Sequence, residues 1–193
     1  QAFQMKLKAY HEKKGWIWTE IKGKSIYNKS GQFLHVLLIA RDISKEREQE
    51  EKLKHLAYHD MLTSLPNRRM FVEQLEVAIQ RLDEEKRPFA ILLLDIDNFK
   101  QINDSYGHEI GDKVIIEFSS RISHIVGERG LVARLGGDEF VVLMKDFINE
   151  EQVVDTARQI NELVKQDIQI QHTHLQITTS IGISMCNRET FTA

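Results

Sequence analysis

The stretch Phe89–Asp97, FAILLLDID, constrains the fold of this 193-residue chain more than any other. Its apolar residues continue without alternation for about the length of one β-strand. An unbroken apolar strand is typical of a sheet that is covered on both faces, whereas a half-exposed strand alternates apolar and polar residues. We therefore expect this segment to lie inside a sheet that is flanked by helices.

The elements around that strand predict a mixed α/β (α+β) sandwich with a partly antiparallel sheet. Upstream, apolar residues recur at helical spacing in the segment that follows Pro66. Downstream, we expect a short helix, a break at glycine and a longer helix that begins near Asp112. Then follow two strands joined by a tight turn, an amphipathic helix and a β-rich stretch, in LVARLGGDEFVVLM, EEQVVDTARQINELV and IQIQHTHLQITTSIGIS.

The N-terminal part predicts an antiparallel strand pair and a connecting helix. Trp16–Lys22 and residues 33–40 have strand character, and NKSG between them is turn chemistry. A lone strand pair is marginally stable in water, so we expect its partners to lie upstream of Gln1. The charged segment from Ser44 to about His59 favours a helix with Asp42 or Ser44 as its N-cap. Its pattern does not separate a solvated linker from a helix that pairs with its own copy.

Two groups of carboxylates stand out at the ends of predicted strands. Asp95 and Asp97 close the apolar strand on one face, and Asp138 and Glu139 follow the glycine pair of LGGDEF. If the two strands are neighbours, three or four negative charges converge, and a hard divalent cation, Mg²⁺ or Mn²⁺, relieves their repulsion. The alternative for the glycine-rich segment is an ordinary hairpin with solvated acids at its tip.

Residues beside these acids suit a nucleotide. Gly136 and Gly137 can adopt positive φ and let a base or ribose approach the backbone. Lys100 and Asn103 share one helical face, so the amine can meet a phosphate and the amide a base edge. Two further residues each have two possible roles. Asp112 is either an acceptor for guanine or the N-cap of the helix that follows it. His108 is either a substrate contact or a structural hydrogen bonder.

Composition excludes several classes of partner. The net charge of −3 gives no basic field for a nucleic acid polymer. No apolar run approaches the ~20 residues that a membrane helix needs, so we expect no direct membrane contact, although a longer protein could be membrane-attached. The single cysteine, Cys186, suits a reducing compartment such as the cytoplasm. His172 and His174 are expected to lie on a solvated hairpin rather than to bind a metal.

Several segments, in order, resemble the GGDEF family, the diguanylate cyclases. They are AYHDMLTSLPNRR, DIDNFKQINDSYGHEIGDKV, VARLGGDEFVVLM and ITTSIGIS, from about Leu56 to Ser184. The upstream GWIWTEIKGKSIYNKSGQFLHVLLIARDIS resembles the C-terminal end of a PAS sensor domain. The resemblance implies a PAS fragment over residues 1–44, a signalling helix over 45–59 and a C-terminally truncated GGDEF domain over 60–193, with a nucleotidyl cyclase and polymerase palm fold.

The resemblance also implies a role for each site residue. The metal would be held by Asp95, by the carbonyl of Ile96 and by Asp138, which would also accept the proton, with support from Glu139. Lys100 and the backbone near Phe99 would contact phosphates. The guanine nucleotide would be bound by Asn103, His108 and Asp112, beside Gly136 and Gly137.

The implied reaction condenses two GTP into cyclic di-GMP, a bacterial second messenger, and releases pyrophosphate in a homodimer under PAS control. The alternatives are a catalytically silent GTP-binding domain that regulates an attached phosphodiesterase domain, and a pure sensor and dimerisation module. Two features depart from the family. Residues 127–130 read GERG where many members carry an inhibitory R-x-x-D site, so we expect no feedback inhibition there. A terminal helix with basic residues is also missing.

Overall fold

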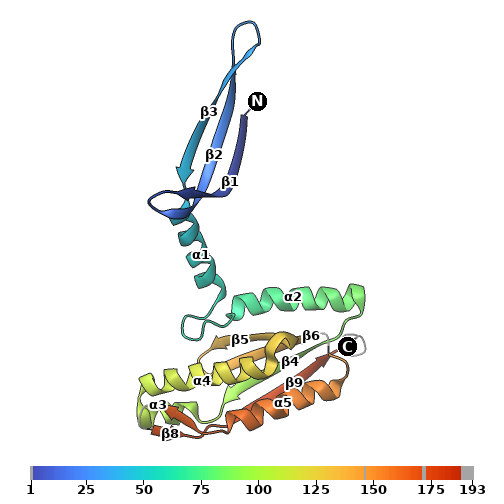
Figure 1. Ribbon diagram of the computed structural model, residues 1–193. Coiled ribbons are helices and arrows are strands. Elements are labelled where there is room, and N and C mark those ends of the chain that lie inside the picture. The colour runs from blue at the N-terminus through green and yellow to red at the C-terminus, as the bar shows by residue number, and fades with distance from the viewer. Residues whose placement is uncertain (1, 146, 171–172, 188–193) are drawn as a thin grey trace. The chain divides into compact units, whose positions relative to one another are not determined.

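The computed structural model describes residues 2–145, 147–170 and 173–187, which divide into two compact units, Gln1–His55 and Leu56–Ala193. Figure 1 shows the elements of both units. Among the described residues, no helix combines the length and apolar character that a bilayer crossing requires.

The first unit is a three-stranded antiparallel sheet in the order β1-β2-β3. Its strands are β1 (Ala2–His11), β2 (Gly15–Tyr27) and β3 (Phe33–Asp42). The prediction of a strand pair with partners only upstream of Gln1 was wrong, because β1 lies within the chain and pairs with β2 along its whole length. Its alternating sequence, FQMKLKA, is a strand pattern that the prediction overlooked.

Helix α1 (Ser44–Tyr58) follows β3 and confirms the predicted connecting helix. The carboxylate of Asp42 accepts a hydrogen bond from the Ser44 N–H at 3.0 Å, so Asp42 satisfies a donor at the start of the helix. The Ser44 hydroxyl instead accepts from the Trp18 N–H at 2.9 Å and joins the helix start to β2.

The second unit confirms the predicted order of elements. They are α2 (Arg68–Glu85), β4 (Phe89–Ile96), α3 (Phe99–Tyr106), α4 (His108–Val126), a 3₁₀ turn (Gly127–Arg129), β5 (Gly130–Gly136), β6 (Glu139–Lys145), α5 (Glu150–Val164), β7 (Ile168–Ile170), β8 (Thr173–Leu175) and β9 (Thr179–Cys186). The main sheet has the order β5-β6-β4-β9, and its neighbouring strands all pair antiparallel.

Helices cover this sheet from both sides (Figure 1). On one face, Leu92 and Leu94 of β4 pack in a core with residues of α4 and α5, among them Phe118 and Ile160. The Phe118 ring meets Phe140 of β6 edge to face, with ring centroids 4.9 Å apart. On the other face, α2 covers Phe89 and the neighbouring strands with Phe71, Ala78 and Leu82.

The expectation that β4 is covered on both faces along its whole length was wrong at its C-terminal end. Phe89 and Ile91 pack in the α2 cluster, but Leu93 on the same face is 52% exposed and Asp95 is exposed. The register places Gly182 of β9 beside Leu93, so no side chain from β9 covers it. The α2 face of the sheet therefore stays open next to Asp95.

Two polar contacts complete this unit. The guanidinium of Arg121 on α4 donates to the carbonyls of Leu163, Val164 and Gln166 at 2.6–3.1 Å and so caps the end of α5. Of the two histidines noted above, His172 lies outside the described residues. His174 is exposed, and its Nδ1 lies 2.6 Å from a carboxylate oxygen of Asp167.

Candidate active site

The antiparallel pairing of β4 with β6 brings two of the predicted acids together. Asp95, one residue before the end of β4, is the cross-strand partner of Glu139, the first residue of β6, and Asp138 directly precedes it. Desolvation raises the pKa of Asp95, and the negative charges of Asp138, Glu139 and Asp97 raise it further. The three acids around Asp95 are therefore close enough to repel it.

Asp97 differs from the expectation that it shares a strand face with Asp95. Strand β4 ends at Ile96, and the Asp97 carboxylate accepts hydrogen bonds from the hydroxyls of Thr178 and Ser180 at 2.6 and 2.7 Å. These hydroxyl hydrogen bonds lower the pKa of Asp97. Both carboxylate oxygens of Asp97 therefore accept hydrogen bonds from β9 and the segment before it. Asp97 stabilises the connection between β4 and β9 instead of completing a metal site.

The remaining donors fit a divalent cation that is shared with a substrate. Within the described ranges, no three His, Cys, Asp or Glu side chains already form a metal cage. Mg²⁺ in nucleotide sites is usually held by only one or two carboxylates and takes phosphate oxygens and water for the rest of its shell. The facing pair Asp95 and Glu139, with Asp138 beside it, is such a donor set, and its mutual repulsion favours a bound cation.

The turn between β5 and β6 has the backbone that its glycines were expected to allow. Gly136 has φ +144° and Gly137 has φ +55°, and both are exposed. A Cβ added at either position would meet nothing within 4 Å. Backbone conformation, rather than lack of space, therefore requires glycine here.

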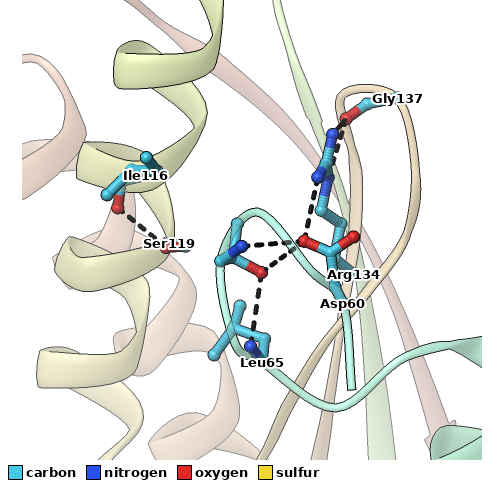
Figure 2. Close-up of polar contacts among 7 residues, drawn as sticks. Asp60, Leu65, Ile116, Ser119, Arg134 and Gly137 are labelled. Carbon is cyan, nitrogen blue, oxygen red and sulfur yellow. Dashed lines mark hydrogen bonds and ion pairs between the residues drawn. The ribbon is translucent and has the colours of Figure 1, made fainter. Parts of the chain in front are cut away.

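Arg134 is tied to this turn, and sequence reasoning overlooked it. Its Nε and Nη2 donate to the Gly137 carbonyl at 3.0 and 2.7 Å, and its Nη1 donates to Asp60 Oδ1 at 2.9 Å (Figure 2). The same Asp60 oxygen accepts from the N–H and the hydroxyl of Thr63. A signal was available, since Arg134 is a charged residue inside an otherwise apolar strand, two positions before the glycines.

The corner between α3 and α4 carries the predicted base-binding residues. Helix α4 begins at His108, not near Asp112, because only Gly107 leaves helical geometry, with φ +83°. Asp112 therefore lies inside the helix, and its alternative role as N-cap is wrong. Gly111 is helical and allows close packing, since a Cβ there would lie 1.9 Å from Asn103 Oδ1. Asn103 and Asp112 thus lie on adjoining turns of one corner.

The other predicted residues occupy different surroundings. Ile96 is 1% exposed and ends β4, and the Phe99 side chain is buried in the core at the start of α3. Lys100 and His108 are exposed, as is Asp112. No hydrogen bond or ion pair joins these three side chains to another described residue, which leaves them available to a ligand. A hollow of about 610 Å³ borders the turn at Gly136 and is lined mainly by the first turns of α2 and by Arg134.

An antiparallel sheet between helix layers, with acids at the ends of its two central strands, defines a domain with the palm-like fold of nucleotidyl cyclases. The chain belongs to the GGDEF family, because the sequence model described as "Diguanylate cyclase, GGDEF domain" matches residues 57–193.

Known proteins agree with this assignment. The chain is 44% identical over 137 residues to MucR of Pseudomonas aeruginosa, a bifunctional diguanylate cyclase and cyclic di-GMP phosphodiesterase. The matched region covers 69% of this chain and 19% of MucR. Its structure is similar to that of the coiled coil and GGDEF domain of DgcB from Caulobacter crescentus, which was solved in complex with c-di-GMP. The TM-score is 0.71 at 29% sequence identity, and the superposed region covers 76% of this chain and 78% of the DgcB chain.

A third relative is a truncated form of TpbB from Pseudomonas aeruginosa that comprises only its GGDEF domain. The TM-score is 0.64 at 38% identity, over 66% of this chain and 74% of that chain. The chain spans about a fifth of the length of MucR and of the signaling protein YkoW of Bacillus subtilis.

Proposed function

We propose that this chain contains the catalytic domain of a diguanylate cyclase, which condenses two GTP into cyclic di-GMP. The observation that carries the proposal is the pairing of Asp95 with Glu139 beside an unaltered glycine-glycine turn. A domain that had kept only nucleotide binding would not need this cluster of repelling acids. MucR and TpbB, which are both named as diguanylate cyclases, support the same reaction.

In this proposal the α3–α4 corner selects guanine. Asn103 offers both a donor and an acceptor, and the Asp112 carboxylate accepts from the N1–H and exocyclic amine of the base. His108 is the first residue of α4, one turn before Asp112. The exposed Lys100 ammonium and the backbone near Phe99 contact the phosphates, and Gly136 and Gly137 leave room for the nucleoside.

Asp95, Asp138 and Glu139, with the carbonyl of Ile96, would hold Mg²⁺ or Mn²⁺, which when bound neutralises phosphate charge and acidifies the attacking hydroxyl. Asp138 accepts the proton of the ribose 3′-hydroxyl. The 3′-oxygen then forms a bond to the α-phosphorus of the second GTP, and the bond to the β-phosphate oxygen breaks to release pyrophosphate. The same exchange in the opposite sense closes the ring.

We place this activity in a homodimer inside a reducing compartment, since each domain presents one such site and two GTP must meet. The first unit is assigned as the end of a PAS sensor domain whose orientation is passed on through α1. Turnover that stays unchanged after insertions of one, two and three residues into α1 would contradict that control. A silent GTP-binding domain that regulates an attached phosphodiesterase domain is the second candidate. MucR combines a phosphodiesterase with a cyclase, which supports an attached phosphodiesterase domain but not the silence of the GTP-binding domain.

The test is incubation of the protein with GTP and Mg²⁺, followed by chromatography of the products. We expect cyclic di-GMP and pyrophosphate, and loss of both in Asp138→Ala. Asp155→Ala, which removes an exposed acid on α5 that pairs with Arg158, is the control and should leave synthesis unchanged. GTP binding without product would support the silent domain, and synthesis by Asp138→Ala would refute the site.

A further inference from the structure

The glycine-glycine turn places Asp138, yet its own residues do little to fix it. Gly136 and Gly137 are exposed, and no atom outside the turn comes within 4 Å of the positions their Cβ atoms would occupy. Two adjacent glycines also give the backbone its widest choice of conformations. An external contact is therefore needed to hold the peptide between Gly137 and Asp138 in one orientation.

The Arg134 guanidinium makes that contact. Two of its N–H groups converge on the Gly137 carbonyl, which belongs to the peptide bond preceding Asp138. The Arg134 side chain is only 11% exposed, so solvent screens these bonds little. Figure 2 shows the guanidinium lying between Gly137 on one side and Asp60 on the other.

Asp60 in turn fixes the guanidinium. Burial alone would raise the pKa of Asp60, but hydrogen bonds from Arg134 and Thr63 outweigh it and lower the pKa. Asp60 is therefore ionised at neutral pH and binds the third corner of the guanidinium. Its loop is itself closed, since the Asp60 N–H donates to the Leu65 carbonyl and the Arg134 N–H donates to the Pro66 carbonyl.

We propose that Arg134 is a positioning residue for the cyclase reaction: through the Gly137 carbonyl it sets where the Asp138 carboxylate meets Asp95 and Glu139, and Asp60 holds it in place. The proposal rests on the proposed function and deepens it. It also extends to the end of α1, because the Asn67 side chain donates to the Ala57 carbonyl and the Asn67 N–H to the Tyr58 carbonyl. The loop that holds Arg134 thus begins at the last turn of that helix.

The decisive variant is Arg134→Lys, which keeps the positive charge but loses the planar fork that binds Gly137 and Asp60 together. We expect a ~10- to 100-fold lower kcat, the loss that a displacement of about 1 Å produces, with a small change in KM for GTP. If Arg134 instead acted as a charge on the phosphates, lysine would restore most of the rate. Asp60→Asn keeps an acceptor oxygen for the guanidinium, so its kcat should fall less than that of Asp60→Ala.

Arg121→Lys is the matched control, because Arg121 is also 11% exposed and also binds backbone carbonyls through its fork, but at the end of α5. It should lower the unfolding midpoint and leave kcat unchanged. The control shows how much kcat is lost for a given loss of stability. If the loss of kcat in Arg134→Lys is no larger than its own loss of stability accounts for on that scale, the proposal is overturned.

A second measurement needs no turnover. Hydrogen–deuterium exchange of the peptide that spans residues 135–141, without nucleotide, should be faster in Arg134→Lys and unchanged in Arg121→Lys. Unchanged exchange in Arg134→Lys would overturn the positioning role even if the protein proved to be a silent GTP-binding domain. Conversely, suppose that exchange is faster in Arg134→Lys although the unchanged protein makes no cyclic di-GMP. That result would support the role of Arg134 in fixing the turn and would refute only the proposed reaction.

Discussion

Asp95 faces Glu139 across two strands while Asp138 and Asp97 add further negative charge to its surroundings. Like charges directly opposite each other in a sheet destabilise the fold. The proposed metal site requires the same arrangement, so the acids that would bind the cation lower the stability of the metal-free protein.

Asp95→Asn should therefore stabilise the metal-free protein at neutral pH by a few tenths of a kcal/mol to about 1 kcal/mol while it abolishes synthesis. Because the folded-state pKa of Asp95 is raised, the unfavourable term is absent below its ordinary value of 3.8 and develops as the pH rises through the raised pKa. Urea unfolding in EDTA should show the gain at pH 7 and lose it at about pH 3.5.

Asp155→Asn is the control for this comparison, because its exposed acid pairs with Arg158 instead of with other acids. It should give no gain at either pH. An Asp95→Asn protein that is less stable than the unchanged protein at pH 7 would show that the acids do not repel one another as described.

Glycines at the start and end of elements show what a sequence can and cannot predict. The order of helices and strands after Phe71 was predictable, because periodicity and unbroken apolar runs depend on local pattern alone. The start of α4 was not predictable, because a glycine such as Gly111 often marks a helix break in a sequence. Here Gly111 is helical and allows Asn103 to pack closely against it. Only tertiary packing distinguishes these two uses of glycine.

The candidate site follows the same division. The acids of β4 and β6 could be predicted because each ends or begins a recognisable strand, and their convergence needed only that the strands be neighbours. The Asp60–Arg134 pair joins residues 74 positions apart, and no local pattern predicts such a contact. The separate use of Asp97 likewise depends on the position of β9 beside β4.

Strand β5 begins at Gly130, where many family members carry the aspartate of the inhibitory motif. A Cβ at this position would lie 2.7 Å from the backbone carbonyl oxygen of Leu143 on β6, and backbone cannot yield as a side chain can. The chain therefore lacks both the residues of that motif and the space for its aspartate.

Gly130→Ala should consequently lower the free energy of unfolding by about 1–3 kcal/mol, as overpacking does. The matched control is Gly182→Ala on β9, where an added Cβ meets nothing within 4 Å and no positive φ is required. Denaturant unfolding measures the difference between the two variants. Equal stabilities of the two variants would mean that β5 and β6 can separate locally, and the space argument against an aspartate would then fail.

At the scale of the whole molecule, the proposed reaction requires two chains. Each second unit presents one Asp95–Glu139 pair and one α3–α4 corner, so in the proposed reaction each would hold one GTP. Two identical sites that each attack the other's substrate must face each other across a two-fold axis. A copy with a disabled site then blocks an intact copy with which it pairs.

Mixing therefore distinguishes a two-chain site from a complete site in each chain. When an equal amount of Asp138→Ala protein is added to a fixed amount of unchanged protein and the subunits exchange, about half of the intact–intact dimers should remain, and the rate of synthesis should fall to about half. Asp155→Ala protein, added in the same way, should instead raise the rate, because its site is intact. A rate that does not respond to Asp138→Ala protein would mean that a single chain completes the reaction, since random pairing of identical subunits leaves no other way to keep every intact site active.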